Sequence, residues 1–132
     1  MSIPLSIVSI DVQGEQQFMP ARTGELVQGT LGILILKALL AEPTHGYGIA
    51  RWIEQTTRDA LRIEEGSLYP ALRRLEDRGF VRSEWGISDN NRRARYYQLT
   101  SAGRGHLRAE AAAWTSYAGA MLSVLRATPA LA

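Results

Sequence analysis

The sequence predicts a mainly α (α+β) domain, built from helices and one β-hairpin and ending in a long helix. Three observations lead to this prediction. Apolar residues recur at helical spacing through residues 25–78. Two short alternating segments follow between residues 80 and 99, joined by a polar stretch of turn-forming residues. Seven-residue apolar series then run through residues 101–126, and the total of 132 residues suits one domain.

The first helix is expected over residues 25–41, ELVQGTLGILILKALLA, which is apolar on nearly every face. Such a segment suits a central helix that neighbouring elements cover on several sides. Pro43 is expected to end it, because proline disfavours helical backbone in the residue before it. Residues 1–24 contain interrupting glycines and a proline, and they are interpreted as an N-terminal extension without an assigned function.

Two shorter helices are expected next, over residues 46–58 and 67–78, with Thr44 as the N-cap of the first. In the first of them, helical spacing assigns an inner face to Tyr47, Ile49, Ala50 and Ile53. Its outward residues are expected to be Arg51, Glu54 and Arg58. In the second, the buried stripe is Leu68, Leu72 and Leu75. Pro70 is compatible with its first turn, and Gly79 supplies a C-terminal stop.

A hairpin is expected from strands at Phe80–Trp85 and Arg95–Leu99, with the long polar loop GISDNNRRA between them. Thr100 or Ser101 is expected to cap the last helix, which spans residues 101–126 and leaves 127–132 as a tail. The apolar series of that helix form a coiled-coil-like seam, and such a long helix usually needs a partner. The seam, together with the adjacent Leu122, predicts a dimer interface. Its residues are Leu107, Ala111, Trp114, Ala118, Met121, Leu122 and Leu125.

Composition excludes several functional classes. Cysteine is absent, so disulfides and thiolate metal sites are excluded, and a cytoplasmic location is expected. His45 and His106 are the only histidines and lie far apart, so no metal or cofactor is expected, and His45 is interpreted as a helix-start residue. No segment is long and apolar enough for a bilayer, so no membrane partner is expected. No nucleophile–base pair is recognisable, so an enzyme is not expected.

The arginines point to double-stranded DNA. Net charge is only +2 and Lys37 is the only lysine, a bias that a GC-rich genome also explains, so the positions of the arginines matter more. Arg92, Arg93 and Arg95 cluster on the predicted hairpin loop, which suits phosphate binding better than mere solubility. On the preceding helix, Arg73 and Arg74 face outward, although a solvated face paired with Glu76 and Asp77 is the alternative. Helices followed by such a hairpin make a winged helix-turn-helix.

The chain resembles the PadR family of bacterial transcriptional regulators over roughly residues 25–126. The segments that carry the resemblance are GTLGILILKALL, HGYGIARWI, GSLYPALRRLEDRGFV and NNRRARYYQLT, followed by an Ala-Gly pair. The single C-terminal helix is similar to that of the short-tailed subfamily. EWGISDNNRRARYY is similar to a branch often found beside permease genes. The extension before the first helix is longer than the usual start of the family.

The resemblance implies a homodimeric repressor that binds a palindromic operator. The residues that it implies at DNA, together with those of the hairpin loop, are Tyr47, Ser67, Tyr69, Pro70, Arg73, Arg74, Asn91, Arg92, Arg93 and Arg95. It also implies that Tyr96 and Tyr97 are structural at the base of the hairpin. Trp114 falls where relatives that sense drugs stack a ligand, so a small hydrophobic or aromatic effector is a further expectation.

Two other functional classes remain open at this point. A winged helix that binds an acidic protein would use the same arginine-rich face with weak affinity for DNA. A small-molecule-binding protein would use Trp114, either as part of a dimer core or as a flat wall for a planar ligand. Replacing Arg73 and Arg92, or following Trp114 fluorescence, would distinguish these classes from a DNA-binding regulator.

Overall fold

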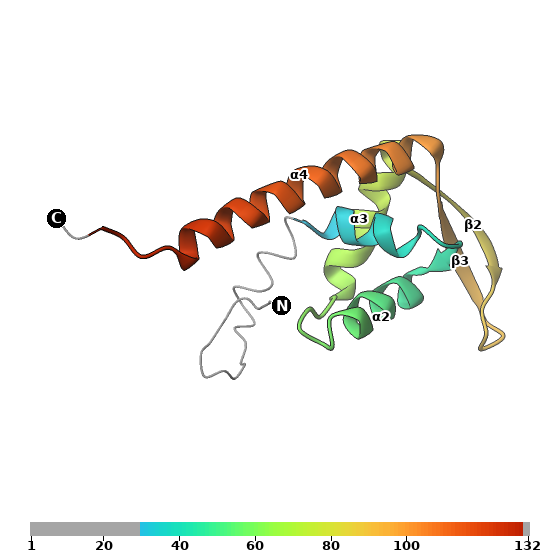
Figure 1. Ribbon diagram of the computed structural model, residues 1–132. Coiled ribbons are helices and arrows are strands. Elements are labelled where there is room, and N and C mark those ends of the chain that lie inside the picture. Colours follow the sequence, from blue (N-terminus) through green and yellow to red (C-terminus); the bar gives the residue numbers. More distant parts are fainter. Residues whose placement is uncertain (1–29, 131–132) are drawn as a thin grey trace.

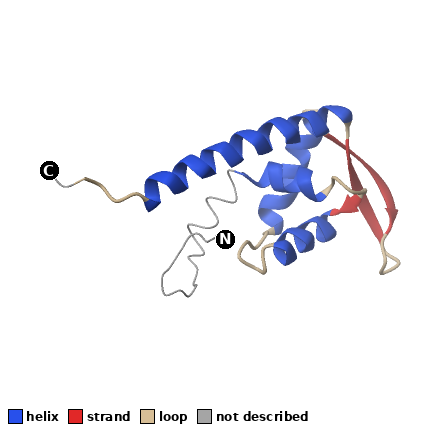
Figure 2. Ribbon diagram, viewed as in Figure 1, coloured by secondary structure: helices blue, strands red, loops and turns tan. Residues whose placement is uncertain are grey.

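The computed structural model describes residues 30–130. A helix over residues 30–38 is followed by a short strand and two more helices, a hairpin and the long last helix (Figures 1 and 2). The element bounds are β1 Thr44–His45, α2 Gly46–Thr56, α3 Glu65–Asp77, β2 Val81–Ile87, β3 Arg93–Leu99 and α4 Ser101–Arg126. The predicted winged-helix fold with a long C-terminal helix is confirmed. The predicted extension over residues 1–24 and the start of the first helix lie outside the described residues.

One hydrophobic core joins the first helix, α2, α3, the base of the hairpin and the start of α4. Its buried side chains include Ile35 and Leu36 of the first helix, Ile49 and Ile53 of α2, Leu68 and Leu72 of α3, and Leu99 and Leu107. The predicted leucine stripe of α3 is therefore confirmed. The first helix ends at residue 38, several residues before Pro43, because the chain must extend to form β1 at Thr44.

Strand β1 was not predicted from the sequence. β1 joins the hairpin in an antiparallel sheet of order β1-β3-β2, with Thr44 opposite Tyr97 and His45 opposite Tyr96. The prediction that Thr44 caps α2 is wrong, because the cap position falls one residue later and the Thr44 hydroxyl donates to the Glu42 carbonyl at 3.0 Å instead. His45 is the cap instead, and its Nδ1 accepts a hydrogen bond from the Gly48 N–H at 2.9 Å. The interpretation of His45 as a helix-start residue is thus confirmed.

Two side chains of α2 face the opposite way from the prediction. Tyr47 was expected on the inner face, yet 68% of it is exposed. Glu54 was expected to face solvent, yet only 9% of it is exposed. Its Oε2 accepts a hydrogen bond from the Ile63 N–H at 2.9 Å and lies 3.8 Å from the Arg62 Nε. Glu54 therefore ties the loop between α2 and α3 to α2, which helical spacing alone does not reveal.

The hairpin strands are longer than predicted and the loop is shorter. β2 and β3 pair through Gly86–Ala94 to Ile87–Arg93, so the loop covers residues 88–92 and not 86–94. The Ser88 N–H donates to the Arg92 carbonyl at 2.8 Å, and Asn91 closes the turn with a φ of 59°. The prediction that Arg93 lies on the loop is wrong, because it belongs to β3, whereas Arg95 lies in β3 in agreement with the predicted strand Arg95–Leu99. We call this hairpin, residues 81–99, the wing.

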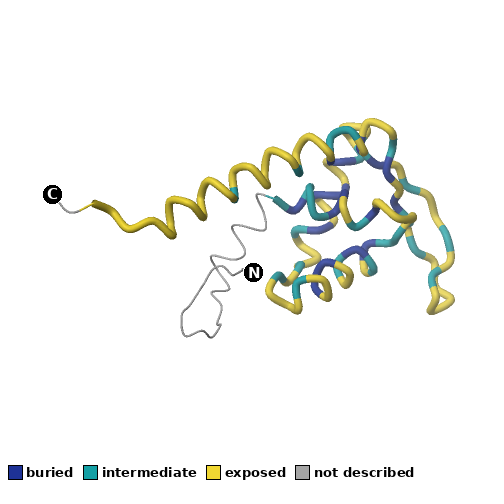
Figure 3. Tube along the Cα trace, viewed as in Figure 1, coloured by how far each residue is buried: buried dark blue, intermediate teal, exposed yellow. Residues whose placement is uncertain are grey.

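The helix α4 begins on the base of the wing and then leaves the domain. Thr100 caps it as predicted, with its hydroxyl oxygen accepting from the Gly103 N–H at 3.0 Å. Gly79 ends α3 with a φ of 79°, again as predicted. Leu107 packs in the core of its own chain with 6% exposed, whereas most of the helix beyond it is exposed (Figure 3). The predicted seam therefore has its exposed part from Ala111 onward.

Candidate nucleic-acid interface

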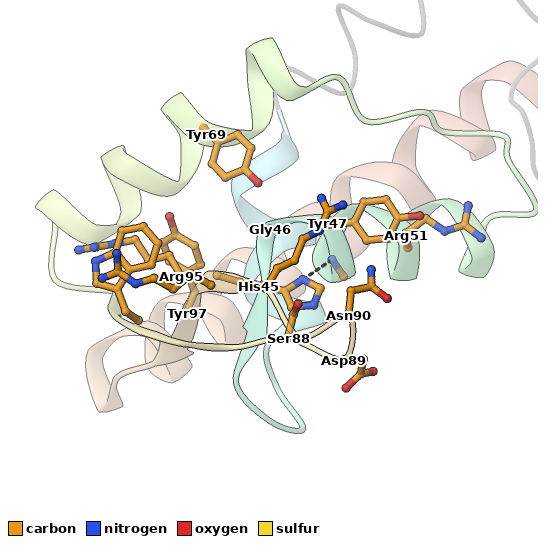
Figure 4. A pocket seen from close by; sticks show the side chains of 15 residues that line it. His45, Gly46, Tyr47, Arg51, Tyr69, Ser88, Asp89, Asn90, Arg95 and Tyr97 are labelled. Carbon is orange, nitrogen blue, oxygen red and sulfur yellow. Dashed lines mark hydrogen bonds between the residues drawn. The ribbon is translucent and has the colours of Figure 1, made fainter.

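A concave surface lies between the start of α2, the helix α3 and the wing (Figure 4). We call it the wing groove, and its volume is about 920 Å³. It is lined by four arginines, which are Arg51, Arg92, Arg93 and Arg95, and by a single carboxylate, Asp89. A concave surface with this excess of guanidinium groups suits a polyanion, because arginine binds phosphate through its planar fork of N–H donors.

The helix α3 reaches the groove through Tyr69, whose ring points toward the first turn of α2 (Figure 4). A Cβ atom on Gly46 would lie 2.8 Å from the Tyr69 Cζ and 2.5 Å from its hydroxyl oxygen. Only glycine at this position therefore leaves room for the tyrosine ring. The Tyr69 side chain therefore lies against the first turn of α2, and it is the residue through which α3 lines the groove.

The start of α2 is the second wall of the groove. His45, Gly46, Tyr47 and Gly48 all line it, and the first turn of α2 contains no acidic residue. A helix N-terminus carries a partial positive charge from its aligned peptide dipoles. The electrostatic character of this wall therefore agrees with that of the arginines on the wing.

The wing is the third wall, and its arginines are held by neighbours. The Arg93 guanidinium lies 4.4 Å from the centre of the Trp85 ring, and that of Arg95 lies 5.4 Å away. The Arg95 Nε donates to the Ser83 Oγ at 2.8 Å, and Ser83 in turn donates to Glu76 at 2.7 Å. Because Glu76 belongs to α3, this chain of contacts joins the wing to that helix.

Two tyrosines at the groove have shifted acidities. Burial is the main cause that raises the pKa of Tyr69, and the charge of Glu65 adds to it. Burial also raises the pKa of Tyr97, while nearby Arg95 and Arg73 act in the opposite direction. Both phenols therefore stay protonated at neutral pH and present neutral hydrogen-bonding groups. The resemblance implied a structural Tyr97, and its burial at the base of the wing agrees.

The structure brings together half of the residues that were predicted to contact DNA. Tyr47, Tyr69, Arg92, Arg93 and Arg95 line the wing groove. Ser67, Pro70, Arg73, Arg74 and Asn91 do not line it, although all of these except the half-buried Ser67 are exposed. The prediction that Pro70 occupies the first turn of its helix is wrong, because α3 begins at Glu65 and Pro70 is therefore its sixth residue.

The lining residues that were not predicted at the site include Arg51, Trp85 and His45. Arg51 was expected only to face solvent, because nothing in the sequence places α2 beside the wing. Trp85 was assigned to a strand face without a partner. The alternation of the hairpin contained a signal, since Trp85 pairs with Arg95 once the register is known.

The exposed part of α4 carries an apolar face. Exposed large side chains include Trp114, Tyr117, Met121, Leu122, Val124 and Leu125. Ala111 and Ala118 lie on the same predicted seam and are half-buried.

Within residues 30–130, no helix is long and apolar enough to cross a membrane. In the same part of the chain, no three histidine, cysteine or carboxylate side chains gather as a metal site would require.

Comparison with known proteins agrees with this architecture. Residues 35–109 match the PadR-like family of transcriptional regulators. The crystal structure of a PadR family transcriptional regulator from Eggerthella lenta is 31% identical with a TM-score of 0.67, covering 83% of this chain and 93% of that chain. An uncharacterized protein of Lysinibacillus sphaericus is 32% identical over 84 residues, which make up 63% of this chain and 76% of that protein.

A transcriptional regulator of Mycobacterium tuberculosis is 42% identical over 57 residues, or 42% of this chain, and the match spans 52% of that protein's length. The family match covers more than half of the present chain and includes α2, α3 and the whole wing. The family consists of transcriptional regulators and not enzymes, in agreement with the sequence-based expectation. With its winged-helix fold and arginine-lined groove, this chain belongs to the PadR-like family of transcriptional regulators.

Proposed function

We propose that the protein is a homodimeric repressor that binds a palindromic operator in double-stranded DNA. The observation that carries this proposal is the wing groove, where four arginines face one carboxylate between α3, α2 and the wing. DNA-binding proteins position themselves through phosphate contacts of this kind and read sequence from base edges. We propose that the groove supplies the phosphate contacts and that the exposed face of α3 supplies the contacts with base edges.

In the proposed complex, α3 enters the major groove with its N-terminal half toward the bases. Tyr69, Pro70, Arg73 and Arg74 are exposed on this helix, and Ser67 is half-buried. Arginine reads guanine through two parallel hydrogen bonds, so Arg73 and Arg74 are the expected base-reading or phosphate-binding residues. Arg92 and Asn91 at the wing tip contact the flanking backbone, and Tyr47 contacts it from α2.

The proposed dimer forms through α4. An exposed apolar face on a helix that extends from the domain is unfavourable in water, and packing against a second copy would bury it. Trp114, Ala118, Met121, Leu122 and Leu125 belong to the predicted seam on this face. Two reading helices related by a two-fold axis would then face half-sites about 34–36 Å apart, one turn of DNA.

Release from the operator is proposed to follow effector binding at the dimer interface. Trp114 is 49% exposed on α4, so its indole is accessible to a planar apolar ligand in the space between two subunits. A ligand that binds better to a dimer with a different distance between its two α3 helices would lower the affinity for the operator. Quenching of Trp114 fluorescence, assigned with Trp114→Phe, would report such a ligand.

The decisive experiment is a binding titration with DNA from immediately upstream of the protein's own gene, beside a scrambled duplex, at two salt concentrations. Nanomolar, sequence-selective binding that weakens steeply with salt is expected of a specific regulator with several phosphate contacts. Arg92→Ala should weaken binding to both duplexes and lower the salt slope by about one. Equal, weak binding of the wild type to both duplexes would contradict the proposal for this operator.

A matched control is available on the same hairpin. Arg82 is exposed on β2, but alternation places it on the face opposite to Trp85, and it does not line the wing groove. Arg82→Ala removes the same charge from the same hairpin, so it should leave affinity and salt slope almost unchanged. Equal losses in Arg82→Ala and Arg92→Ala would mean that only overall charge matters.

The dimer has its own test. Met121→Glu introduces a charge into the predicted seam and should shift the protein toward monomer in sedimentation, because burying an unpaired charge is costly. Ser116→Glu adds the same charge to the opposite face of α4 and should leave the oligomeric state unchanged. A wild-type monomer at micromolar concentration would contradict the proposed interface.

A further inference from the structure

The two arginines of β3 have different surroundings, although both lie against Trp85. Arg93 and Arg95 are two residues apart on one strand, so their side chains share a face, and Trp85 on β2 is the direct partner of Arg95. The indole lies 4.4 Å from the Arg93 guanidinium and 5.4 Å from that of Arg95. The two arginines differ in the hydrogen-bond and ion-pair partners of their guanidinium groups.

The Arg95 guanidinium is partly engaged within the protein. Its Nε donates to the Ser83 hydroxyl oxygen at 2.8 Å, and its NH2 nitrogen lies 3.9 Å from the Glu76 carboxylate. That carboxylate also accepts from Ser83 at 2.7 Å, so the three side chains form one closed group. A phosphate that approached Arg95 would have to compete with a carboxylate that is already in place.

Arg93 has no such partner. Among residues 30–130, its guanidinium forms no salt bridge and no side-chain hydrogen bond, and its described contact is the face of Trp85. It is exposed, and it lines the wing groove. A guanidinium stacked on an aromatic face keeps its N–H donors free at its edge, where a phosphate binds them in pairs.

We infer that Arg93 is the phosphate-binding arginine of β3, that Trp85 is the positioning residue that holds it, and that Arg95 serves to join the wing to α3. This inference rests on the proposed function, because it assumes that the wing groove binds DNA. Stacking on Trp85 restricts the rotamers of Arg93 before DNA arrives, so less side-chain freedom is lost on binding. It also attracts the cation to the indole face.

The test measures the affinity of four proteins, namely wild type, Trp85→Ala, Arg93→Ala and the double variant. The probes are the duplex from upstream of the gene and its scrambled counterpart. Trp85→Ala should weaken binding to both duplexes by about three- to tenfold, since ordering one long side chain has a cost of that size. Arg93→Ala should weaken both at least as much and lower the salt slope by about one.

The double variant decides whether Trp85 acts through Arg93. If it does, the double variant should bind within about twofold of Arg93→Ala, because nothing is left to position. Losses that multiply would overturn the inference, and so would a Trp85→Ala variant with wild-type affinity. Trp85→Phe keeps an aromatic face and should recover most of the affinity, and a circular dichroism spectrum of Trp85→Ala like that of wild type excludes misfolding as the cause of its loss.

Arg95→Ala is the matched arginine control. It should lower the free energy of unfolding through loss of the contacts with Ser83 and Glu76, and it should lower the salt slope by clearly less than Arg93→Ala does. A decrease in slope equal to that of Arg93→Ala would overturn the division of roles between the arginines. If wild-type protein binds neither duplex, the proposed function fails, and this result is distinct from any difference among variants.

Discussion

Replacing Gly103 with alanine should destabilise the domain at the point where α4 meets the wing. Gly103 is in the first turn of α4, and an added Cβ would overlap the carbonyl oxygen of Phe80 and lie 2.9 Å from its carbonyl carbon. That oxygen cannot simply turn aside, because it accepts the Thr100 N–H at 3.1 Å. The Leu99 Cδ2 lies 3.2 Å from the same position, so the methyl group meets atoms on two sides.

The expected loss in the free energy of unfolding follows from three contributions. Overpacking of a well-filled site typically costs about 1–3 kcal/mol. Loss of the Thr100–Phe80 hydrogen bond adds about 0.5–1.5 kcal/mol, whereas alanine in place of glycine in a helix returns about 0.5–1 kcal/mol. The net loss should therefore be about 0.5–4 kcal/mol, against a total stability of about 5–15 kcal/mol.

Gly105 provides the control within the same helix. A Cβ at this position would meet no atom within 4 Å, so Gly105→Ala should stabilise the protein by about 0.5–1 kcal/mol. Urea unfolding followed by circular dichroism, at one protein concentration for all variants, measures both changes. The reasoning is refuted if Gly103→Ala is as stable as wild type, or if both alanines change stability in the same direction.

Three further predictions concern other parts of the domain. Gly46→Ala should displace the ring of Tyr69, which can swing outward, so DNA affinity should fall by about tenfold or more while the urea midpoint changes little. Gly66→Ala, whose Cβ would meet nothing within 4 Å, should leave DNA affinity unchanged and raise the urea midpoint, as expected for alanine in place of a helical glycine. Glu54→Gln weakens the hydrogen bond to the backbone of the α2–α3 loop and should lower the unfolding free energy by about 1–3 kcal/mol, with earlier amide exchange in that loop. Burial raises the pKa of Tyr97 above its usual 10.0, so this tyrosine ionises first in the unfolded chain. The contribution of Tyr97 to stability should therefore be constant below about pH 10 and decrease as pH rises beyond it, and Tyr97→Phe should flatten this decrease.

The sequence was sufficient for the architecture because its strongest signals are local. The leucine stripe of α3, the stop at Gly79 and the cap at Thr100 each depend on residues within one or two turns. Periodicity and capping report such short-range relations directly. The order of helices and the hairpin therefore followed from the residues, and the PadR resemblance agreed with them.

The errors have the opposite character, since each depends on contacts distant in the chain. β1 exists because Thr44 and His45 pair with a strand some fifty residues later. Glu54 is buried because the loop carrying Ile63 folds back over it. The wing loop is short because β-pairing continues beyond Trp85, which only the register reveals. The candidate site was predicted only in part for the same reason. Arg51 lines the groove because α2 packs beside the wing, and the sequence does not reveal that packing.

The attachment of α4 has a mechanical consequence. Its first turn is fixed to the wing and to α3 through Thr100, whose hydroxyl donates to the Gly79 carbonyl at 2.7 Å while its N–H donates to Phe80. The helix then continues as a rod of 26 residues, about 39 Å long, that extends away from the domain (Figure 1). If α4 tilts by about 5°, one end of a helix of this length moves by roughly 3 Å relative to the other end. In the proposed dimer, small changes where the two α4 helices cross would thus be transmitted to both wings as a rigid rotation, without any unfolding of the winged-helix domains.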